Sequence, residues 1–180
     1  TPRWTAYDAK RFGVTPLHEA ATVGNAAMLS LMLDAGGNAN AEFGEGETVL
    51  MSAARAGDAE SVKALLAHGG SVDAAERWHG QTALMWAAAD GHVAVVSQLL
   101  AAGGARDARL KSGFTAFLFA ARQGRLEVVR ALLKSGANPN AAIETDRGGG
   151  RLPPGGTSAL LLAVENGHFE LALDLIKAGA

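Results

Sequence analysis

The strongest constraint on the fold is a repeat that runs through the sequence in three columns. A Thr or Ser opens each unit, at Thr15, Thr48, Thr82, Thr115 and Ser158. The steps between these residues are 33, 34, 33 and 43 positions. Two glycine columns keep the same register: Gly24, Gly57, Gly91, Gly124 and Gly167, then Gly36, Gly69, Gly103, Gly136 and Gly179. Because three columns share one register, the sequence predicts an array of five similar units.

Each unit predicts two helices. The hydroxyl of the opening Thr or Ser can cap the free N–H groups of a first turn. Apolar residues follow at i, i+3 and i+4, as at Leu17, Ala20 and Ala21, and form one helical face. The first glycine of a unit then ends this helix in a left-handed conformation. A second helix with paired apolar residues ends at the second glycine, and a third set of glycines suits a tight turn before the next unit: Gly46, Gly80, Gly113 and Gly156.

The first unit resembles a known family. Its residues Thr15-Pro16-Leu17-His18-Glu19-Ala20-Ala21 are similar to the T-P-L-H-x-A signature of ankyrin repeats, whose period also matches. This resemblance implies an all-α fold, an ankyrin-repeat solenoid of helix–turn–helix units with β-turn fingers. It further implies a concave groove and a role in protein–protein recognition.

The resemblance also gives boundaries. The array is expected over residues 13–180, after an N-terminal segment, or tail of a preceding repeat, at 1–12. The expected repeats are about 13–45, 46–79, 80–112, 113–155 and a truncated 156–180. Ten extra residues precede the last repeat and predict a loop insertion over 143–155, which a repeat array tolerates outside its core.

The sequence departs from the family at the signature histidine. Only His18 keeps it, and the counterparts are Met51, Met85, Leu118 and Leu161. By resemblance, this histidine bonds the neighbouring finger. We therefore expect weaker polar contacts between repeats, with apolar packing dominant.

The two ends of the array predict exposed faces. Nothing after Lys177 resembles a polar capping helix, and Trp4 and Tyr7 are expected to cover the first repeat. Since repeat arrays need polar caps for solubility, the pattern indicates either a segment of a longer array or ends that stack on other subunits.

Composition excludes several function classes. Lys and Arg number 16 and Asp and Glu 18, so the net charge of -2 gives no global attraction to nucleic acid or to an anionic membrane. The absence of cysteine excludes disulfides, thiolate catalysis and Cys-ligated zinc. No apolar run is long enough for a transmembrane helix. We expect a protein or peptide partner, no nucleic acid and no membrane insertion. Alanine, glycine and arginine usage indicates a bacterial protein.

The candidate partner-binding residues lie on the fingers and on the exposed face of each first helix, where ankyrin repeats bind by resemblance. Aromatic residues beside arginine favour binding hot spots. The candidate anchors are Trp78, His79, Gln81, Trp86, Phe114 and Phe119, with polarity tuned by Arg55, Arg122 and Glu165. An alternative interpretation is that Trp86 and Phe119 pack against each other or against their own fingers.

No residue pattern predicts catalysis, a cofactor or a metal. The five histidines lack metal-ligand spacing. The Gly148–Gly150 run lacks the Lys-Ser/Thr of a phosphate loop. The acidic residues Glu42, Glu45 and Glu47 are interpreted as surface charge, since acid–base work needs a shielded cleft.

The sequence therefore favours a non-enzymatic binding module or scaffold. One alternative is a structural protein that self-assembles by head-to-tail stacking of repeats. Another is a substrate-delivery region of a larger enzyme.

Overall fold

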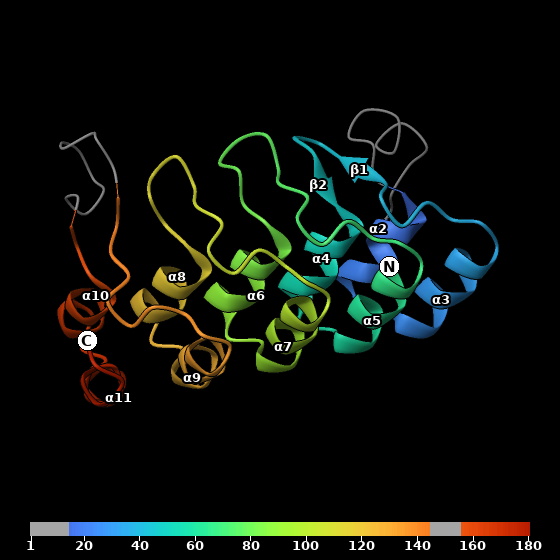
Figure 1. The fold of residues 1–180 in the computed structure, drawn as a ribbon. Coiled ribbons are helices and arrows are strands. Elements are labelled where there is room, and N and C mark those ends of the chain that lie inside the picture. The colour runs from blue at the N-terminus through green and yellow to red at the C-terminus, as the bar shows by residue number, and fades with distance from the viewer. Residues whose placement is uncertain (1–14, 145–155) are drawn as a thin grey trace. The chain divides into compact units, whose positions relative to one another are not determined.

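The computed structural model describes residues 15–144 and 156–180. In this part of the chain, helices follow one another as antiparallel pairs joined by extended fingers (Figure 1). The pairs are α2 (Pro16–Thr22) with α3 (Ala26–Asp34), α4 (Val49–Ala56) with α5 (Ala59–Ala67), α6 (Ala83–Asp90) with α7 (Val93–Ala101), α8 (Ala116–Arg122) with α9 (Leu126–Lys134), and α10 (Ala159–Glu165) with α11 (Phe169–Lys177). The predicted all-α helix–turn–helix repeat fold is confirmed.

The finger between α3 and α4 contains a small sheet. Strand β1 (Glu42–Phe43) pairs antiparallel with β2 (Glu47–Thr48), with Glu42 opposite Thr48. The corresponding fingers contain single bridges, Ala75 with Thr82 and Ala142 with Ser158. Each finger thus returns the chain to the start of the next first helix.

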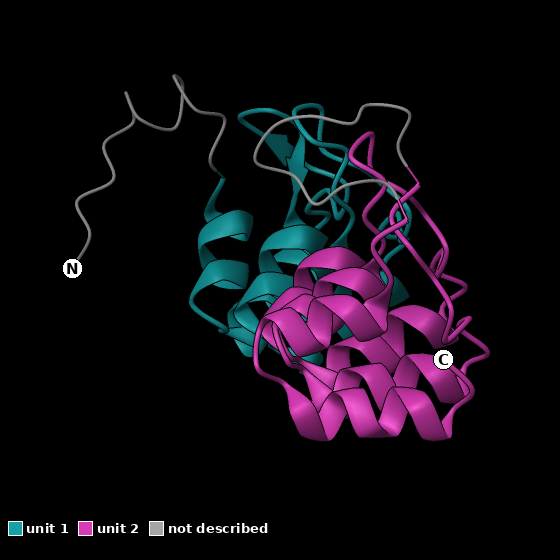
Figure 2. Cartoon of the chain, turned by 90° about the vertical axis from the view of Figure 1, so that its left-hand side faces the viewer, with its two compact units in different colours: residues 1–83 teal, residues 84–180 magenta. Residues whose placement is uncertain are grey.

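The chain divides into two compact units, residues 1–83 and 84–180 (Figure 2). In the first unit, α2 packs on α4 and α3 packs on α5, so equivalent helices of neighbouring repeats are in contact. In the second unit, α8 packs on α10 and α9 packs on both α7 and α11. Small side chains allow the close approach of the first helices: Ala53, Ala54, Ala120 and Ala121 are fully buried.

The predicted N-caps form at the first helices. The hydroxyls of Thr15, Thr48, Thr115 and Ser158 each accept a hydrogen bond from the backbone N–H three residues later. The glycines of the two repeat columns and of the set before each new unit all have positive φ, as the turn chemistry predicts. Gly113 has a second reason to be glycine, because a Cβ there would lie 2.6 Å from the carbonyl oxygen of Glu144 on the next finger.

Two side chains of the second unit each connect their own repeat to the repeat before it. Arg125 and His168 follow the first glycine of their repeats, and neither side chain caps its own helix. Arg125 Nε instead donates to the carbonyl of Ala89 at 2.9 Å, and His168 Nε2 lies 3.2 Å from the carbonyl oxygen of Arg122. Both therefore reach the C-terminal end of a first helix in the preceding repeat.

Polar contacts between repeats also come from loop asparagines. Asn40 donates to the carbonyl of Gly69 at 2.9 Å and accepts from the backbone N–H of Ser71 at 2.7 Å. Asn140 donates in the same way to Gly179 at 3.0 Å. At the signature column, Met51, Met85 and Leu118 are buried, so apolar packing occupies these positions while asparagines supply polar contacts elsewhere.

Some predictions fall outside the described residues. These are the segment 1–12 with Trp4 and Tyr7, and residues 145–155 of the insertion with the Gly148–Gly150 run. Within the described ranges, no helix is both long and apolar enough to cross a membrane.

Candidate functional site

A carboxylate organises the finger between Ala75 and Thr82. The backbone N–H of Glu76 donates to Gln81 at 3.0 Å, which closes the hairpin. The Glu76 side chain folds into the turn and accepts from three backbone N–H groups: Trp78 at 2.6 Å, His79 at 2.8 Å and Gln81 at 2.9 Å. One side chain thus satisfies three backbone donors of the turn.

The electrostatics of Glu76 agree with this geometry. Burial on its own would raise the pKa of the Glu76 carboxyl. The backbone N–H groups of Gln81, His79 and Trp78, with the nearby His79 ring, favour the carboxylate and hold the net pKa below its ordinary value. The turn is therefore held by charge-assisted hydrogen bonds, which are stronger than neutral ones.

This finger presents an aromatic pair to solvent. Trp78 is 74% exposed, the highest value among the large apolar side chains of the described residues. Its ring stacks on His79, with the ring centroids 4.6 Å apart and the planes at 28°. A large exposed aromatic side chain on an ordered turn is typical of a binding hot spot.

The finger is also attached to its neighbour within the first unit. The backbone N–H of Arg77 donates to the carbonyl of Glu45 at 2.8 Å. The Arg77 guanidinium forms an ion pair with Glu42. The position of Trp78 is therefore determined by two adjacent fingers.

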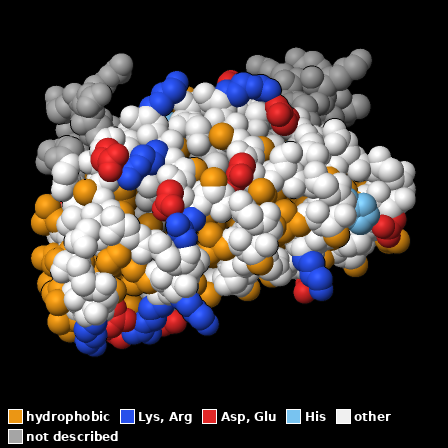
Figure 3. Space-filling model, viewed as in Figure 1, with side chains coloured by type: hydrophobic (Ala, Val, Ile, Leu, Met, Phe, Trp, Pro, Cys, Tyr) orange, Lys and Arg blue, Asp and Glu red, His pale blue; other side chains and the backbone are white. Residues whose placement is uncertain are grey.

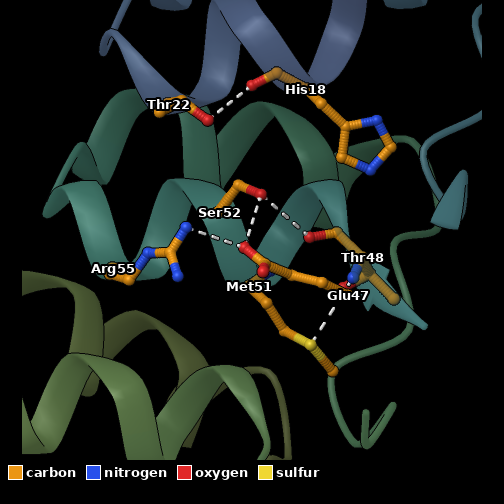
Figure 4. A network of polar contacts seen from close by, with 7 residues as sticks. All are labelled: His18, Thr22, Glu47, Thr48, Met51, Ser52 and Arg55. Carbon is orange, nitrogen blue, oxygen red and sulfur yellow. Dashed lines mark hydrogen bonds and ion pairs between the residues drawn. The ribbon is translucent and has the colours of Figure 1, made fainter. Parts of the chain in front are cut away.

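The first helix of the second repeat carries a polar network (Figure 4). Glu47, at the base of the finger, accepts from Ser52 Oγ at 3.1 Å and pairs with Arg55 at 3.0 Å. Ser52 is buried, whereas the Arg55 side chain is 42% exposed. Arg55 thus faces solvent from a fixed position on α4.

The same spacing carries aromatic residues in the second unit. Phe114 lies at the base of a finger, and Phe119 and Arg122 follow on α8 five and eight positions later, as Ser52 and Arg55 follow Glu47. The Phe114 and Phe119 rings are 5.0 Å apart, and the Arg122 guanidinium lies 5.8 Å from the centre of the Phe114 ring. One backbone arrangement therefore presents an ionic set in one repeat and an aromatic set in another.

Phe114 requires a correction. The sequence places it among the accessible anchors, but it is only 2% exposed, so a partner cannot reach its ring. The finger-base position points toward the first helix of its own repeat, where Phe114 supports Phe119. The Phe119 ring packs on Phe114 at the base of its own finger and is half-buried.

The remaining candidates are distributed over both units. Gln81 contributes its backbone to the Glu76 turn and is half-buried. Trp86 is half-buried on α6, and Glu165 is exposed at the end of α10. The structure therefore brings together Trp78, His79 and Gln81 in the first unit, and Phe114, Phe119 and Arg122 in the second.

Sequence reasoning did not identify Glu76 as a part of these sites. Glu47 and Ser52 stand in the finger and first-helix columns that the sequence indicates as candidate binding positions, although neither was chosen as an anchor. Of the three acidic residues interpreted as surface charge, Glu42 and Glu47 form ion pairs that fix Arg77 and Arg55. In the part of the chain that the structure describes, no group of three or more His, Asp or Glu residues could hold a metal ion.

Comparisons with known sequences agree with this repeat architecture. A three-copy ankyrin-repeat profile matches residues 4–76 and 70–143, and a second ankyrin-repeat profile matches residues 117–176. None of the curated proteins compared with the sequence matches it. Ankyrin repeats are generally protein–protein interaction modules and are typically non-enzymatic. Since the matched ranges span nearly all of the sequence, the chain belongs to the ankyrin-repeat family.

Proposed function

We propose that the chain is an interaction module that binds a partner protein or peptide through the finger that carries Trp78. The exposed, stacked Trp78 ring is the observation that carries this proposal. Arg55 lies on helix α4 of the same unit, where its ion pair with Glu47 holds its guanidinium in place.

Preorganisation supports this choice of site. The ordering of loops and side chains at an interface costs conformational entropy, which weakens the net binding free energy. The Glu76 carboxylate and the Arg77 contacts already order this finger. The hydrophobic gain from covering the Trp78 ring is then available for affinity.

In the second unit, the proposed contact residues are Trp86, Phe119, Arg122 and Glu165. Phe114 is removed from the contacting set because it is buried. Its proposed role is to support the Phe119 ring from inside.

The proposal is tested by selecting peptides from a displayed random library on the immobilised protein, after the library has been depleted on the Trp78→Ala variant. We expect enriched peptides whose Kd for the wild type is at least about tenfold lower than for Trp78→Ala. Isothermal titration calorimetry measures both constants.

The matched control is Leu31→Ala, which removes a similarly exposed apolar side chain from α3 of the same unit. The selected peptides should bind this variant as they bind the wild type. Peptides that bind Trp78→Ala and the wild type equally, or no enrichment at all, would contradict the proposed site.

A further inference from the structure

The negative charge of the chain is concentrated in its first unit. Residues 1–83 contain six Lys or Arg and ten Asp or Glu residues, a net charge of -4, whereas residues 84–180 carry a net charge of +2. Over the described part of the first unit, residues 15–83, nine acidic residues stand against three basic ones. The whole-chain charge of -2 therefore conceals a first unit that attracts positively charged partners.

The arginines near the fingers of this unit already have acidic partners. Arg77 pairs with Glu42, and Arg55 pairs with Glu47 at 3.0 Å. In Figure 3, acidic and basic side chains lie next to each other over the fingers, along the upper edge of the view. The third basic residue of the range 15–83, Lys63, lies on the second helix α5. The arginines beside the Trp78 finger therefore do not repel a cation as unpaired charges would.

Glu45 lies at the tip of the finger next to Trp78. The backbone N–H of Gly46 donates to the carbonyl of Phe43 at 3.0 Å, which closes the turn that contains Glu45. The Glu45 carbonyl accepts from Arg77, the residue before Trp78, so Glu45 and Trp78 belong to adjacent, connected fingers. The Glu45 side chain is exposed and forms no ion pair among the described residues. An uncompensated carboxylate is thus held one residue away from Trp78 across a backbone hydrogen bond.

The Trp78 ring has one face open to solvent. His79 stacks on one face, and the ring is nevertheless 74% exposed. The face of an indole ring is negative and attracts cations more strongly than the other aromatic side chains do. The open face and the neighbouring carboxylate are therefore complementary to the same chemical group, a planar cation.

We propose that the partner binds the first unit through a basic segment, with an arginine whose guanidinium stacks on the open face of Trp78 and pairs with the Glu45 carboxylate. The inference rests on the proposed function, because it uses the same finger. A guanidinium group is planar, so it stacks on an aromatic ring and donates two parallel hydrogen bonds to a carboxylate. The other acidic residues of the unit attract the rest of the segment and speed its association.

An apolar segment is the competing occupant. It would cover Trp78 by hydrophobic contact alone, so its affinity would depend little on the charge of Glu45 or on the salt concentration. A basic segment depends on both. The charge of the bound segment therefore distinguishes the two occupants.

The peptides selected on the immobilised protein test the class of partner. Those that require Trp78 should carry a net positive charge and at least one arginine. Peptides that require Trp78 but carry no net positive charge would contradict the basic partner and leave the Trp78 site intact. The absence of any Trp78-dependent peptide would contradict the site itself, and with it both proposals.

Glu45→Gln tests the contact with the carboxylate. This variant keeps the size of the side chain and the backbone carbonyl that accepts from Arg77. We expect the Kd of an enriched peptide to rise by about three- to fivefold, the effect of losing an exposed ion pair. Isothermal titration calorimetry measures the change.

The matched control for Glu45→Gln is Glu60→Gln. Glu60 is exposed on α5 of the same unit, so its substitution changes the net charge of the unit by the same amount. Because a distant exposed charge is screened by salt, Glu60→Gln should change the Kd by less than about twofold. Equal effects of the two variants would show that only the overall charge of the unit acts, and would overturn the contact with Glu45.

A change in the peptide isolates the proposed pair. Citrulline keeps the planar shape of arginine but has no charge, and it replaces the arginines of an enriched peptide one at a time. One replacement should raise the Kd for the wild type, and the Kd of that peptide should no longer respond to Glu45→Gln. If Glu45→Gln weakens every citrulline peptide by the same factor as the parent peptide, Glu45 does not contact an arginine and the proposal is wrong.

Discussion

Residues of one column fulfil the same local role by different chemistry. His18 Nδ1 lies 2.9 Å from the Thr15 hydroxyl, and the ring packs edge-on against Phe43 of the following finger. At the equivalent place, Met51 Sδ accepts from the backbone N–H of Thr48 at 3.5 Å. Burial lowers the pKa of His18, and the nearby backbone of Glu47 and Ala41 offsets this only in part. The neutral ring is therefore the form that the fold stabilises.

His18 should make the stability of the protein depend on pH. The unfolded histidine has its ordinary pKa near 6.5, and the folded pKa is lower, so the unfolded state binds the proton more readily. The free energy of unfolding should thus be highest above pH 6.5 and should fall as the pH drops toward the folded pKa. Urea titrations over this range measure the effect.

The control is His18→Met, which installs the residue found at position 51. This variant should lose the part of the pH dependence that His18 contributes. If wild type and variant lose stability in parallel as the pH falls, His18 is not the group responsible.

At the scale of single elements, the fingers differ more than the helices do. The finger before α4 is a two-stranded sheet, whereas the Trp78 finger depends on the Glu76 carboxylate in its turn. Since hydrogen bonds to a charged acceptor each contribute more than neutral ones, this one side chain has a large share in ordering the element.

Removal of the carboxylate should loosen the Trp78 finger. Glu76→Ala leaves three backbone N–H groups without their acceptor and should cost about 2 kcal/mol in the local opening free energy. Amide hydrogen exchange at Trp78, His79 and Gln81 should accelerate by about tenfold or more. Glu45→Ala, on the neighbouring finger, should leave these rates unchanged. Unchanged exchange in Glu76→Ala would contradict the role of the carboxylate.

Elements were predictable from sequence where local chemistry determines them. A Thr or Ser before each first helix and a glycine after it are sufficient for caps and left-handed ends, and the structure has both. The repeat period then predicts which helices are equivalent.

Parts of the candidate site were not predictable because they depend on side-chain direction. In the sequence, Glu76 cannot be distinguished from other polar finger residues. Only the structure shows that its carboxylate is directed into the turn. Phe114 has Val14, Glu47, Gln81 and Thr157 at the equivalent positions, so this mixed column does not indicate whether its side chain is buried. A single aromatic residue in that column becomes buried against Phe119.

At the scale of the whole molecule, stability is distributed over two compact units. Leu65 in the first and Leu132 in the second are both fully buried. Since repeat arrays are stabilised by contacts between neighbouring repeats, a cavity should act mainly on the unit that contains it.

Reciprocal cavity variants test this distribution. Leu65→Ala and Leu132→Ala should each cost about 3 kcal/mol. In Leu132→Ala, hydrogen exchange should rise for α8 to α11 while α2 to α5 keep their protection, and Leu65→Ala should give the reverse. Exchange that rises equally over both units in either variant would show that the chain unfolds as one cooperative block.

The contacts of Arg125 and His168 have a consequence for how such a chain can evolve. Each side chain reaches a main-chain carbonyl of the preceding repeat, at Ala89 and Arg122. A carbonyl is present whatever amino acid occupies the acceptor position. A duplicated, deleted or transposed repeat therefore finds an acceptor for this contact without a matching substitution, so this part of the junction does not restrict the number or order of the repeats.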